Sequence, residues 1–404
     1  MNGFFASVEL LSLPELKGKP MAVCGNPENR HGIILAKNEE AKAYGIITAE
    51  TVWQARKKCP NIVLVKPHHD RYHKYSKKIN QIYDRFTDMV EPFSIDESWL
   101  DVTGSRKLFG TGKEIGDKIR AIVKEEIGLT LSVGVSFNKV FAKMGSDYKK
   151  PDATTLISRE NYKNMIWPLP IGDLFFVGSA TAEKLVKAGI TTIGDLAVSN
   201  RKMLSTMLGK QGEVIFDYAN GVDDSPVCFS SERQKIKSVG NGITFKRDLV
   251  GAEDIKTAIV ALTDKVAGRL RSYELKCQGV KIDIKDPLFR TISRQKHLEA
   301  ATNLGNEIVD AAMELMIKSW NFKDPIRMLT ITGIGLVDEN EAEQLSIFCM
   351  DNKNREKSEQ VGRALDNIRQ KYGESAITFG TIINNDIGIE LYEHEEQEVK
   401  ENEF

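Results

Sequence analysis

The residues best suited to chemistry are two adjacent carboxylates, Asp96 and Glu97. Apolar side chains bracket them, namely Ile95, Trp99, Leu100 and Val102. A carboxylate placed against apolar neighbours needs a partner, because an unpaired buried charge is costly. A hard divalent cation, held by one or two carboxylates and by substrate phosphates, is one such partner. Taken alone, however, the pattern fits a solvent-exposed turn better than a metal site.

Two other segments supply the context that favours a metal site. Residues 1–9 read Met-Asn-Gly-Phe-Phe-Ala-Ser-Val-Glu, and residues 134–143 read Gly-Val-Ser-Phe-Asn-Lys-Val-Phe-Ala-Lys, running on to Lys149-Lys150-Pro151. With Ser94-Ile95-Asp96-Glu97, they resemble the three catalytic motifs of Y-family DNA polymerases, translesion enzymes of the DNA polymerase IV type (ImpB/MucB/SamB-like). The matches occur in the family's order and at its spacing. Each is weak alone, but together they are very specific.

The resemblance implies a role for each carboxylate. Asp96 would bridge two Mg²⁺ ions, and Glu97 would hold the ion that activates the primer 3′-hydroxyl. Two such ions stabilise the attacking and leaving oxygens of an in-line phosphoryl transfer. We therefore expect a DNA-directed DNA polymerase, a nucleotidyltransferase that copies damaged template bases with low fidelity. Its substrates would be primer–template DNA and deoxynucleoside triphosphates.

The sequence departs from the family at its first motif. That motif begins with an Asp directly before the position of Met1, at the end of the first palm strand, and the sequence contains neither. The backbone carbonyl of Met1 is then the group there that could reach a metal. We interpret the start as a truncation or as an internal methionine, with a naturally defective relative as the alternative. In either case, we expect the chain as printed to extend primers poorly or not at all.

Four residues are expected to contact the incoming nucleotide. Phe5 aligns with the family's steric gate, an aromatic ring that collides with a ribonucleotide 2′-hydroxyl, and Phe4 beside it is expected to be mainly a core residue. Lys150 stands where the family grips the triphosphate and neutralises charge on the leaving pyrophosphate. Lys42 occupies a position where polymerase IV usually has Arg, which argues against a bidentate phosphate clamp there. The nearby Ala36-Lys37-Asn38 is closer to the polymerase V catalytic subunit, so both branches remain open.

Alternating strands and helices must position these residues. Strands are predicted near 32–36, 62–65, 94–102 (a pair) and 129–136. Helices are predicted near 38–44, from a Thr51 cap to Pro60, and near 69–89, 113–127 and 138–148. This alternation indicates an α/β or α+β layer.

Two further regions are expected to bind DNA. Residues 158–225 are mostly helical, and Gly178, Ser179 and Ala180 resemble a helix-hairpin-helix turn whose amides point at a DNA phosphate, although a plain helical hairpin is the alternative. Residues 235–337 follow a β-α-β-β-α-β order, the ferredoxin-like plan. We expect its basic residues Lys237, Lys246 and Arg247 to bind the DNA.

The resemblance implies a multidomain α+β fold with the right-hand plan of polymerases. A palm would comprise residues 1–6 and 67–157, small fingers 7–66, a helical thumb 158–225, a linker 226–234 and a little finger 235–337. An acidic tail would follow over 338–404. Small fingers leave the active site open to distorted template bases.

Charge and composition fit this assignment. The net charge of −1 divides into +4 over 1–225, +5 over 226–335 and −10 over 336–404. A basic body with an acidic tail suits a polyanion-binding protein, although a neutral enzyme with a solvated tail is equally consistent with charge alone. No long apolar run predicts a membrane span, and the five scattered cysteines predict neither a zinc site nor disulfides. We expect a cytoplasmic monomer.

Two other functions compete with DNA synthesis. A non-catalytic protein that holds DNA and its sliding clamp would explain the absent Asp. A nucleotide cyclase would share a palm with two carboxylates, but a helical thumb and a clamp peptide argue against it.

The acidic tail carries a pattern of its own. Gln344, Leu345, Ile347 and Phe348 resemble the sliding-clamp-binding peptide of bacterial polymerases. A hydrogen-bonding Gln followed by aliphatic and aromatic anchors in a polar surround calls for an external pocket. We therefore expect the sliding clamp as a partner.

We predict that replacing Leu345 and Phe348 with Ala removes clamp binding and leaves binding to naked primer–template DNA unchanged. The peptide's own affinity should be roughly micromolar, because docking an extended segment costs ordering entropy. Titrating labelled clamp and labelled DNA against both proteins measures the two affinities side by side. Equal clamp binding by the double variant would show that the motif is a coincidence.

Overall fold

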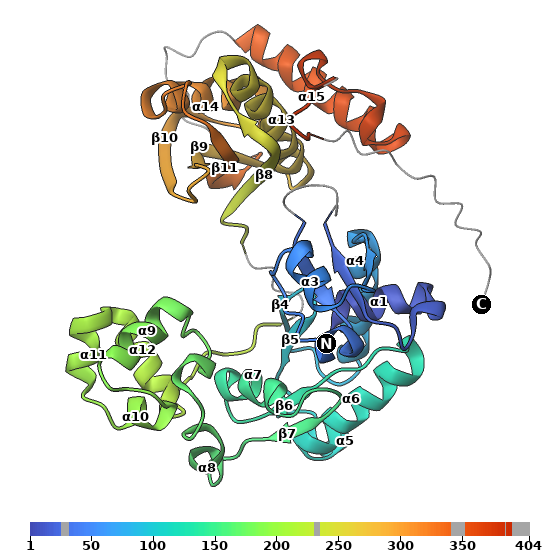
Figure 1. The fold of residues 1–404 in the computed structure, drawn as a ribbon, viewed down its shortest axis with the longest axis vertical. Helices are drawn as coiled ribbons and strands as arrows, with labels where there is room; N and C mark the ends of the chain where they lie inside the picture. Colours follow the sequence, from blue (N-terminus) through green and yellow to red (C-terminus); the bar gives the residue numbers. More distant parts are fainter. Residues whose placement is uncertain (26–31, 230–234, 341–351, 384, 390–404) are drawn as a thin grey trace. The chain divides into compact units, whose positions relative to one another are not determined.

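The two carboxylates lie on a short β-hairpin of the computed structural model. β4 (Val90–Ser94) and β5 (Glu97–Leu100) pair antiparallel, and Asp96 lies in the turn between them (Figure 1). The structure describes residues 1–25, 32–229, 235–340, 352–383 and 385–389. The chain divides into two units, 1–233 and 234–404, and this boundary falls within residues 226–234, which we expected to be a linker.

Other strands of the first unit are short. Among its described residues, β1 (Met21–Cys24) lies between antiparallel β2 (Ile34–Lys37) and parallel β3 (Val63–Val65), and β6 (Val133–Val135) pairs in parallel with β7 (Thr154–Leu156). β6 covers only part of the strand predicted over 129–136. Neither β1 nor β7 was predicted.

Capping side chains set where several helices of this unit begin. Thr51 and Gln54 form a capping box at α3 (Val52–Lys58), as the sequence predicted for Thr51. Asn138 caps α7 (Lys139–Tyr148) by accepting a hydrogen bond from the Phe141 amide at 2.8 Å. The remaining α-helices described here are α1 (Phe4–Ser12), α2 (Glu39–Ala43), α4 (His69–Tyr83), α5 (Arg106–Phe109), α6 (Gly112–Ile127), α8 (Tyr162–Ile166), α9 (Ser179–Lys187), α10 (Ile193–Ala197), α11 (Arg201–Leu208) and α12 (Lys210–Ala219). No helix in the described ranges is long and apolar enough to cross a membrane.

The opening residues form a helix that the sequence analysis did not predict. α1 begins at Phe4, directly after Gly3 in the left-handed region at φ 50°. Before it, the Asn2 amide donates a 3.1 Å hydrogen bond to the Thr130 carbonyl, which ties the chain start to the segment leading into β6. α1 has no side-chain cap, and this is why a capping signal could not reveal it.

A close approach between β6 and α7 fixes the helix that faces the hairpin. A Cβ on Gly134 would lie 1.8 Å from the Ala142 carbonyl oxygen and 2.5 Å from the Ser146 nitrogen. Only a glycine allows the strand to cross the helix backbone at this distance. α7 is thereby held with Lys143 on the side of the carboxylates.

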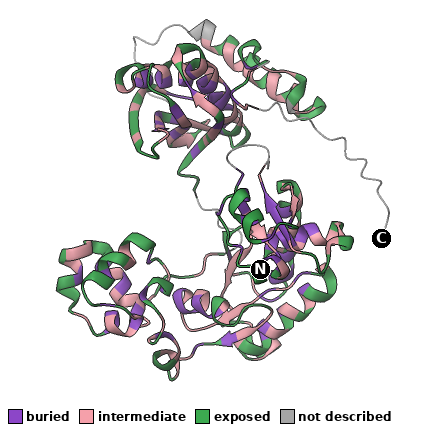
Figure 2. Ribbon diagram, viewed as in Figure 1, coloured by how far each residue is buried: buried purple, intermediate pink, exposed green. Residues whose placement is uncertain are grey.

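The second unit has the predicted β-α-β-β-α-β order, and the predicted α+β class is confirmed. Its strands are β8 (Ser238–Leu249), β9 (Leu275–Lys285), β10 (Thr291–Thr302) and β11 (Ile326–Asp338), in the antiparallel sheet order β10-β9-β11-β8. α13 (Gly251–Ser272) and α14 (Gly305–Ser319) contribute their apolar faces to one core with the sheet (Figure 2).

Part of the expected acidic tail is folded onto this unit. α15 (Asn352–Tyr372) docks on α13 through two buried or half-buried arginine pairs, Arg271 with Asp366 at 2.5 Å and Arg369 with Asp264 at 2.8 Å. Ile387 lies in the core of the unit. The described part of 338–404 is therefore an integral layer of the second unit, whereas residues 390–404 lie outside the described residues.

We predict that Gly134→Ala destabilises the first unit by about 3 kcal/mol or more, because the added methyl group meets backbone atoms that cannot rotate away. Thermal and urea unfolding measure the loss. Gly104→Ala is the matched control, since nothing lies within 4 Å of its added Cβ. It should change stability by less than about 0.5 kcal/mol. Equal melting temperatures for Gly134→Ala and the parent would contradict the packing argument.

Candidate active site

The hairpin presents Asp96 and Glu97 on a half-exposed turn beside a pocket. The side chains are each 29% exposed, and the Ser94 hydroxyl donates to Asp96 Oδ1 at 3.0 Å. Both carboxylates line the pocket, together with Tyr83, Leu131, Ser136 and Lys150. The two acidic residues that the sequence placed in one motif thus share one cavity.

The N-terminus of the chain lies against Asp96. The Met1 ammonium donates to the Asp96 carbonyl at 2.9 Å and lies 3.6 Å from Asp96 Oδ2. Burial lowers the pKa of this ammonium, and the charge of Asp96 opposes that shift. Asn2 anchors the segment, because its side chain donates to Thr130 and accepts from Ser132. The structure therefore places the Met1 nitrogen beside Asp96, and the predicted contact of the Met1 carbonyl with a metal stays a prediction.

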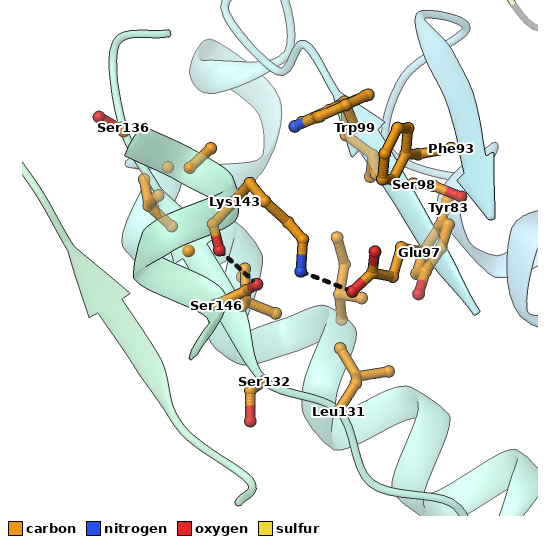
Figure 3. A pocket seen from close by; sticks show the side chains of 18 of the residues that line it. Tyr83, Phe93, Glu97, Ser98, Trp99, Leu131, Ser132, Ser136, Lys143 and Ser146 are labelled. Atoms are coloured by element: carbon orange, nitrogen blue, oxygen red, sulfur yellow. Dashed lines mark hydrogen bonds and ion pairs between the residues drawn. The ribbon is translucent and has the colours of Figure 1, made fainter. Parts of the chain in front are cut away.

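A lysine on α7 faces Glu97 across the pocket (Figure 3). Lys143 Nζ lies 2.7 Å from Glu97 Oε1 and 3.0 Å from Asp147 Oδ2, and only 16% of its side chain is exposed. Burial acts to lower the pKa of Lys143, but its hydrogen bonds to Glu97 and Asp147 outweigh burial and raise it. The side chain therefore holds a positive charge beside the carboxylate at neutral pH.

The donor set fits a magnesium site that is completed by substrate. The described residues contain no cluster of three or more His, Cys, Asp or Glu side chains that could hold a metal alone. Mg²⁺ characteristically binds one or two carboxylates and takes its other ligands from phosphates and water. The Lys143 ammonium, 2.7 Å from Glu97 Oε1, places a positive charge against one of these carboxylates.

Phe5 and Phe4 occupy different environments. The Phe5 ring is half-buried and stacks on the Tyr72 ring at a centroid distance of 4.0 Å. The Tyr72 hydroxyl donates to the buried Glu9 carboxylate at 2.6 Å, which fixes the platform beneath Phe5. Phe4 is only 4% exposed and belongs to the core. Of the two rings, only that of Phe5 has substantial surface available to a ligand.

Comparisons with known proteins agree with this geometry. Residues 1–147 match the impB/mucB/samB family, and residues 236–347 match the C-terminal domain of the same family. DNA polymerase IV of Acetivibrio thermocellus is 46% identical over 95% of this chain and 96% of that protein. The chain belongs to the impB/mucB/samB family.

Other relatives of this family extend the comparison. DNA polymerase IV of Clostridium kluyveri is 40% identical over 95% of this chain and 96% of that protein. DNA polymerase IV 1 of Bacillus subtilis is 37% identical over 96% of this chain and 92% of that protein. A solved structure, the Y-family DNA polymerase chimera Dbh-Dpo4(243-245)-Dbh, shares the fold with a TM-score of 0.73 at 24% identity, over 83% of this chain and 97% of that one. The chain is therefore a Y-family DNA polymerase of the DNA polymerase IV type, a nucleotidyltransferase.

Lys42 on α2, which the family resemblance assigned to nucleotide binding, is exposed. Lys42 lies 3.3 Å from Glu39, and both side chains are more than half exposed. Burial lowers the pKa of Lys37, and the nearby positive charge of Lys42 lowers it further. Lys150 instead lines the pocket and pairs with Asp147 at 2.5 Å. Whether Lys42 and Lys150 bind nucleotide stays a prediction for this impB/mucB/samB protein.

The predicted DNA contacts of the first unit lie at an uncapped helix start. Gly178 is the N-cap of α9 and has no side-chain capping hydrogen bond, and Ser179 and Ala180 are exposed behind it. Backbone amides at such a start lack intrahelical partners. They are available to an anion, as the helix-hairpin-helix resemblance requires.

The three basic residues predicted to bind DNA in the second unit differ in environment. Lys237 and Lys246 are exposed, one before β8 and one on it. Arg247 instead pairs with Asp254 at 2.5 Å and Asp386 at 2.6 Å, so its guanidinium ties α13 and the C-terminal segment to β8. These contacts give Arg247 a structural role that the sequence pattern did not indicate. The clamp-binding residues 344–348 lie outside the described residues.

Sequence reasoning gave no role to two residues that complete the site, Lys143 and Asp147. The sequence did contain a signal for these residues. Lys143, Asp147 and Lys150 follow one another at spacings of four and three, which place side chains on the same face of a helix. That this row faces Glu97 depends on how β6 crosses α7. The spacing within one helix could not reveal it.

Proposed function

We propose that the chain synthesises DNA past damaged template bases by a two-metal nucleotidyl transfer at Asp96 and Glu97. One observation supports the proposal above all. Two adjacent carboxylates share a pocket with the lysines Lys143 and Lys150. Carboxylates for cations and lysines for phosphates are the complementary groups that a metal-bound triphosphate needs.

Each residue has a distinct part in this proposal. Bound Mg²⁺ would supply charge neutralisation at the attacking and leaving oxygens. Asp96 and Glu97 provide carboxylate oxygens to hold it, and the Lys150 ammonium neutralises charge on the pyrophosphate as it leaves. Phe5, held on Tyr72, blocks the space beneath the sugar where a 2′-hydroxyl would project.

The N-terminal geometry supports a third carboxylate next to the pair. The Met1 nitrogen lies 3.6 Å from Asp96 Oδ2, so a residue joined to it would begin beside that carboxylate. An Asp at that position could share a cation with Asp96. We propose that such an Asp completes the metal site and that the Met1 carbonyl stands beside it.

The remaining assignments rest on the family. Primer–template DNA and deoxynucleoside triphosphates are the proposed substrates, with Gly178, Ser179, Ala180, Lys237 and Lys246 at the DNA backbone. The proposed partner is a sliding clamp bound through residues 344–348. We further propose that the protein acts as a cytoplasmic monomer.

We predict that, in a version of the chain in which a segment ending in Asp precedes Met1, Asp96→Asn and Glu97→Gln each lower primer extension by at least about 10²–10³-fold, because each removes a negative charge that positions a cation. The assay compares the chain as printed with a version in which a segment ending in Asp precedes Met1, and the second should be far more active. Affinity for primer–template DNA, measured by anisotropy, should stay within about twofold, since neither residue is among the proposed DNA contacts.

Asp101→Asn is the matched control for this experiment. Asp101 follows β5 on the same hairpin and accepts a hydrogen bond from the Thr103 amide at 2.8 Å, but it does not line the pocket. Its substitution should leave extension unchanged. Strong extension by Asp96→Asn, or equal activity with and without the added Asp, would overturn the respective assignment.

We predict that, in the version with an Asp before Met1, Phe5→Ala lowers the preference for deoxynucleotides over ribonucleotides by at least tenfold, or about 1.4 kcal/mol. The reason is that the small side chain no longer collides with the 2′-hydroxyl. Single-turnover incorporation of both nucleotide types measures the ratio. Phe4→Leu should reduce stability, because Phe4 is buried, yet leave this ratio intact. An unchanged ratio in Phe5→Ala would show that Phe5 is only a packing residue.

A further inference from the structure

Four alternating charges connect the metal-binding side of the pocket to its phosphate-binding side. Glu97 bonds Lys143 at 2.7 Å, Lys143 bonds Asp147 at 3.0 Å, and Asp147 bonds Lys150 at 2.5 Å. This series of charges runs from Glu97 on β5 to α7 and ends just beyond the helix, at Lys150. Figure 3 shows its first contact, between Glu97 and Lys143. Its two ends are the residues proposed above to meet the cation and the triphosphate.

The two inner residues of this chain each serve two partners. Lys143 divides its ammonium between two carboxylates, and Asp147 offers one oxygen to each lysine. The hydrogen bonds from Lys150 and Lys143 keep the pKa of Asp147 low although burial acts to raise it. An ion that loses one of two partners is drawn more strongly to the other, because its charge is then compensated by that partner alone.

We propose that Lys143 and Asp147 are positioning residues that couple nucleotide binding at Lys150 to cation binding at Glu97. The inference rests on the proposed function of those two end residues. A triphosphate that takes Lys150 leaves Asp147 to Lys143, and Lys143 then releases Glu97 to a cation. The reverse order has the same effect, because coupling between two sites is reciprocal. In the absence of ligands, Lys143 keeps the Glu97 carboxylate compensated and oriented.

The coupling can be tested without any metal ion. Glu97→Gln imitates a carboxylate whose charge a cation has neutralised, so Lys143 should shift to Asp147 and free Lys150. Affinity for the correct deoxynucleoside triphosphate is measured in a chelator on primer–template DNA with a dideoxy-terminated primer. We expect Glu97→Gln to tighten this affinity about fivefold.

A second variant separates the coupling through Lys143 and Asp147, here called the relay, from direct repulsion between Glu97 and the triphosphate. In an Asp147→Asn background the relay is cut, whereas direct repulsion remains. The gain from Glu97→Gln should therefore be several-fold smaller there than in the parent. It should also shrink at about 1 M salt, because Asp147 and Lys150 are partly exposed and such charges are screened.

Glu91→Gln provides the matched control. Glu91 pairs with Lys139 of α7 at 2.6 Å, so its loss breaks a carboxylate–lysine contact to the same helix without touching the relay. Nucleotide affinity should not change in this variant. Equal gains from Glu97→Gln with and without Asp147→Asn would overturn the proposed coupling. Loss of nucleotide affinity in Lys150→Ala tests the role of Lys150 itself, so a failure of the coupling can be told apart from a failure of the proposed function.

Discussion

Two adjacent negative charges on one turn are the constraint on which the site depends. Asp96 and Glu97 repel each other and lie beside an apolar-walled pocket, where charge is weakly compensated by solvent. The fold brings the Lys143 ammonium to Glu97 and the segment around Met1 and Asn2 to Asp96. Neither comes from the hairpin. The position of Glu97 beside the pocket therefore depends on α7 being held against the hairpin.

That requirement explains features of the first unit that have no chemistry of their own. The glycine at 134 lets β6 cross α7 at backbone contact, and Asn138 fixes where α7 begins. Asn2 ties the chain start to residues 130 and 132. Each contact is modest, but each sets the position of a charge. An error of about 1 Å in such a position is costly in catalysis, since the benefit depends on alignment.

The sequence could predict the elements whose signals are local. The Thr51 cap, the helical periodicity of α4 and the β-α-β-β-α-β succession of elements in the second unit follow from spacing within short windows. It could also place Asp96, Glu97 and Lys150 in one site through the family resemblance. α1 escaped prediction because Gly3, in the left-handed region, replaces a capping side chain. The three-residue strand β7 is too short for an alternating pattern to be distinctive.

What the sequence could not supply are contacts between distant charged residues. Arg271 with Asp366 and Arg369 with Asp264 convert part of an acidic region into a packed layer, although its composition is typical of a solvated tail. Lys143 with Glu97 follows the same rule, since 46 positions separate them. Composition counts charges, whereas function depends on which charges face each other. In this chain Glu97, Asp264 and Asp366 each meet a lysine or arginine brought to them from another element, and only the fold determines that pairing.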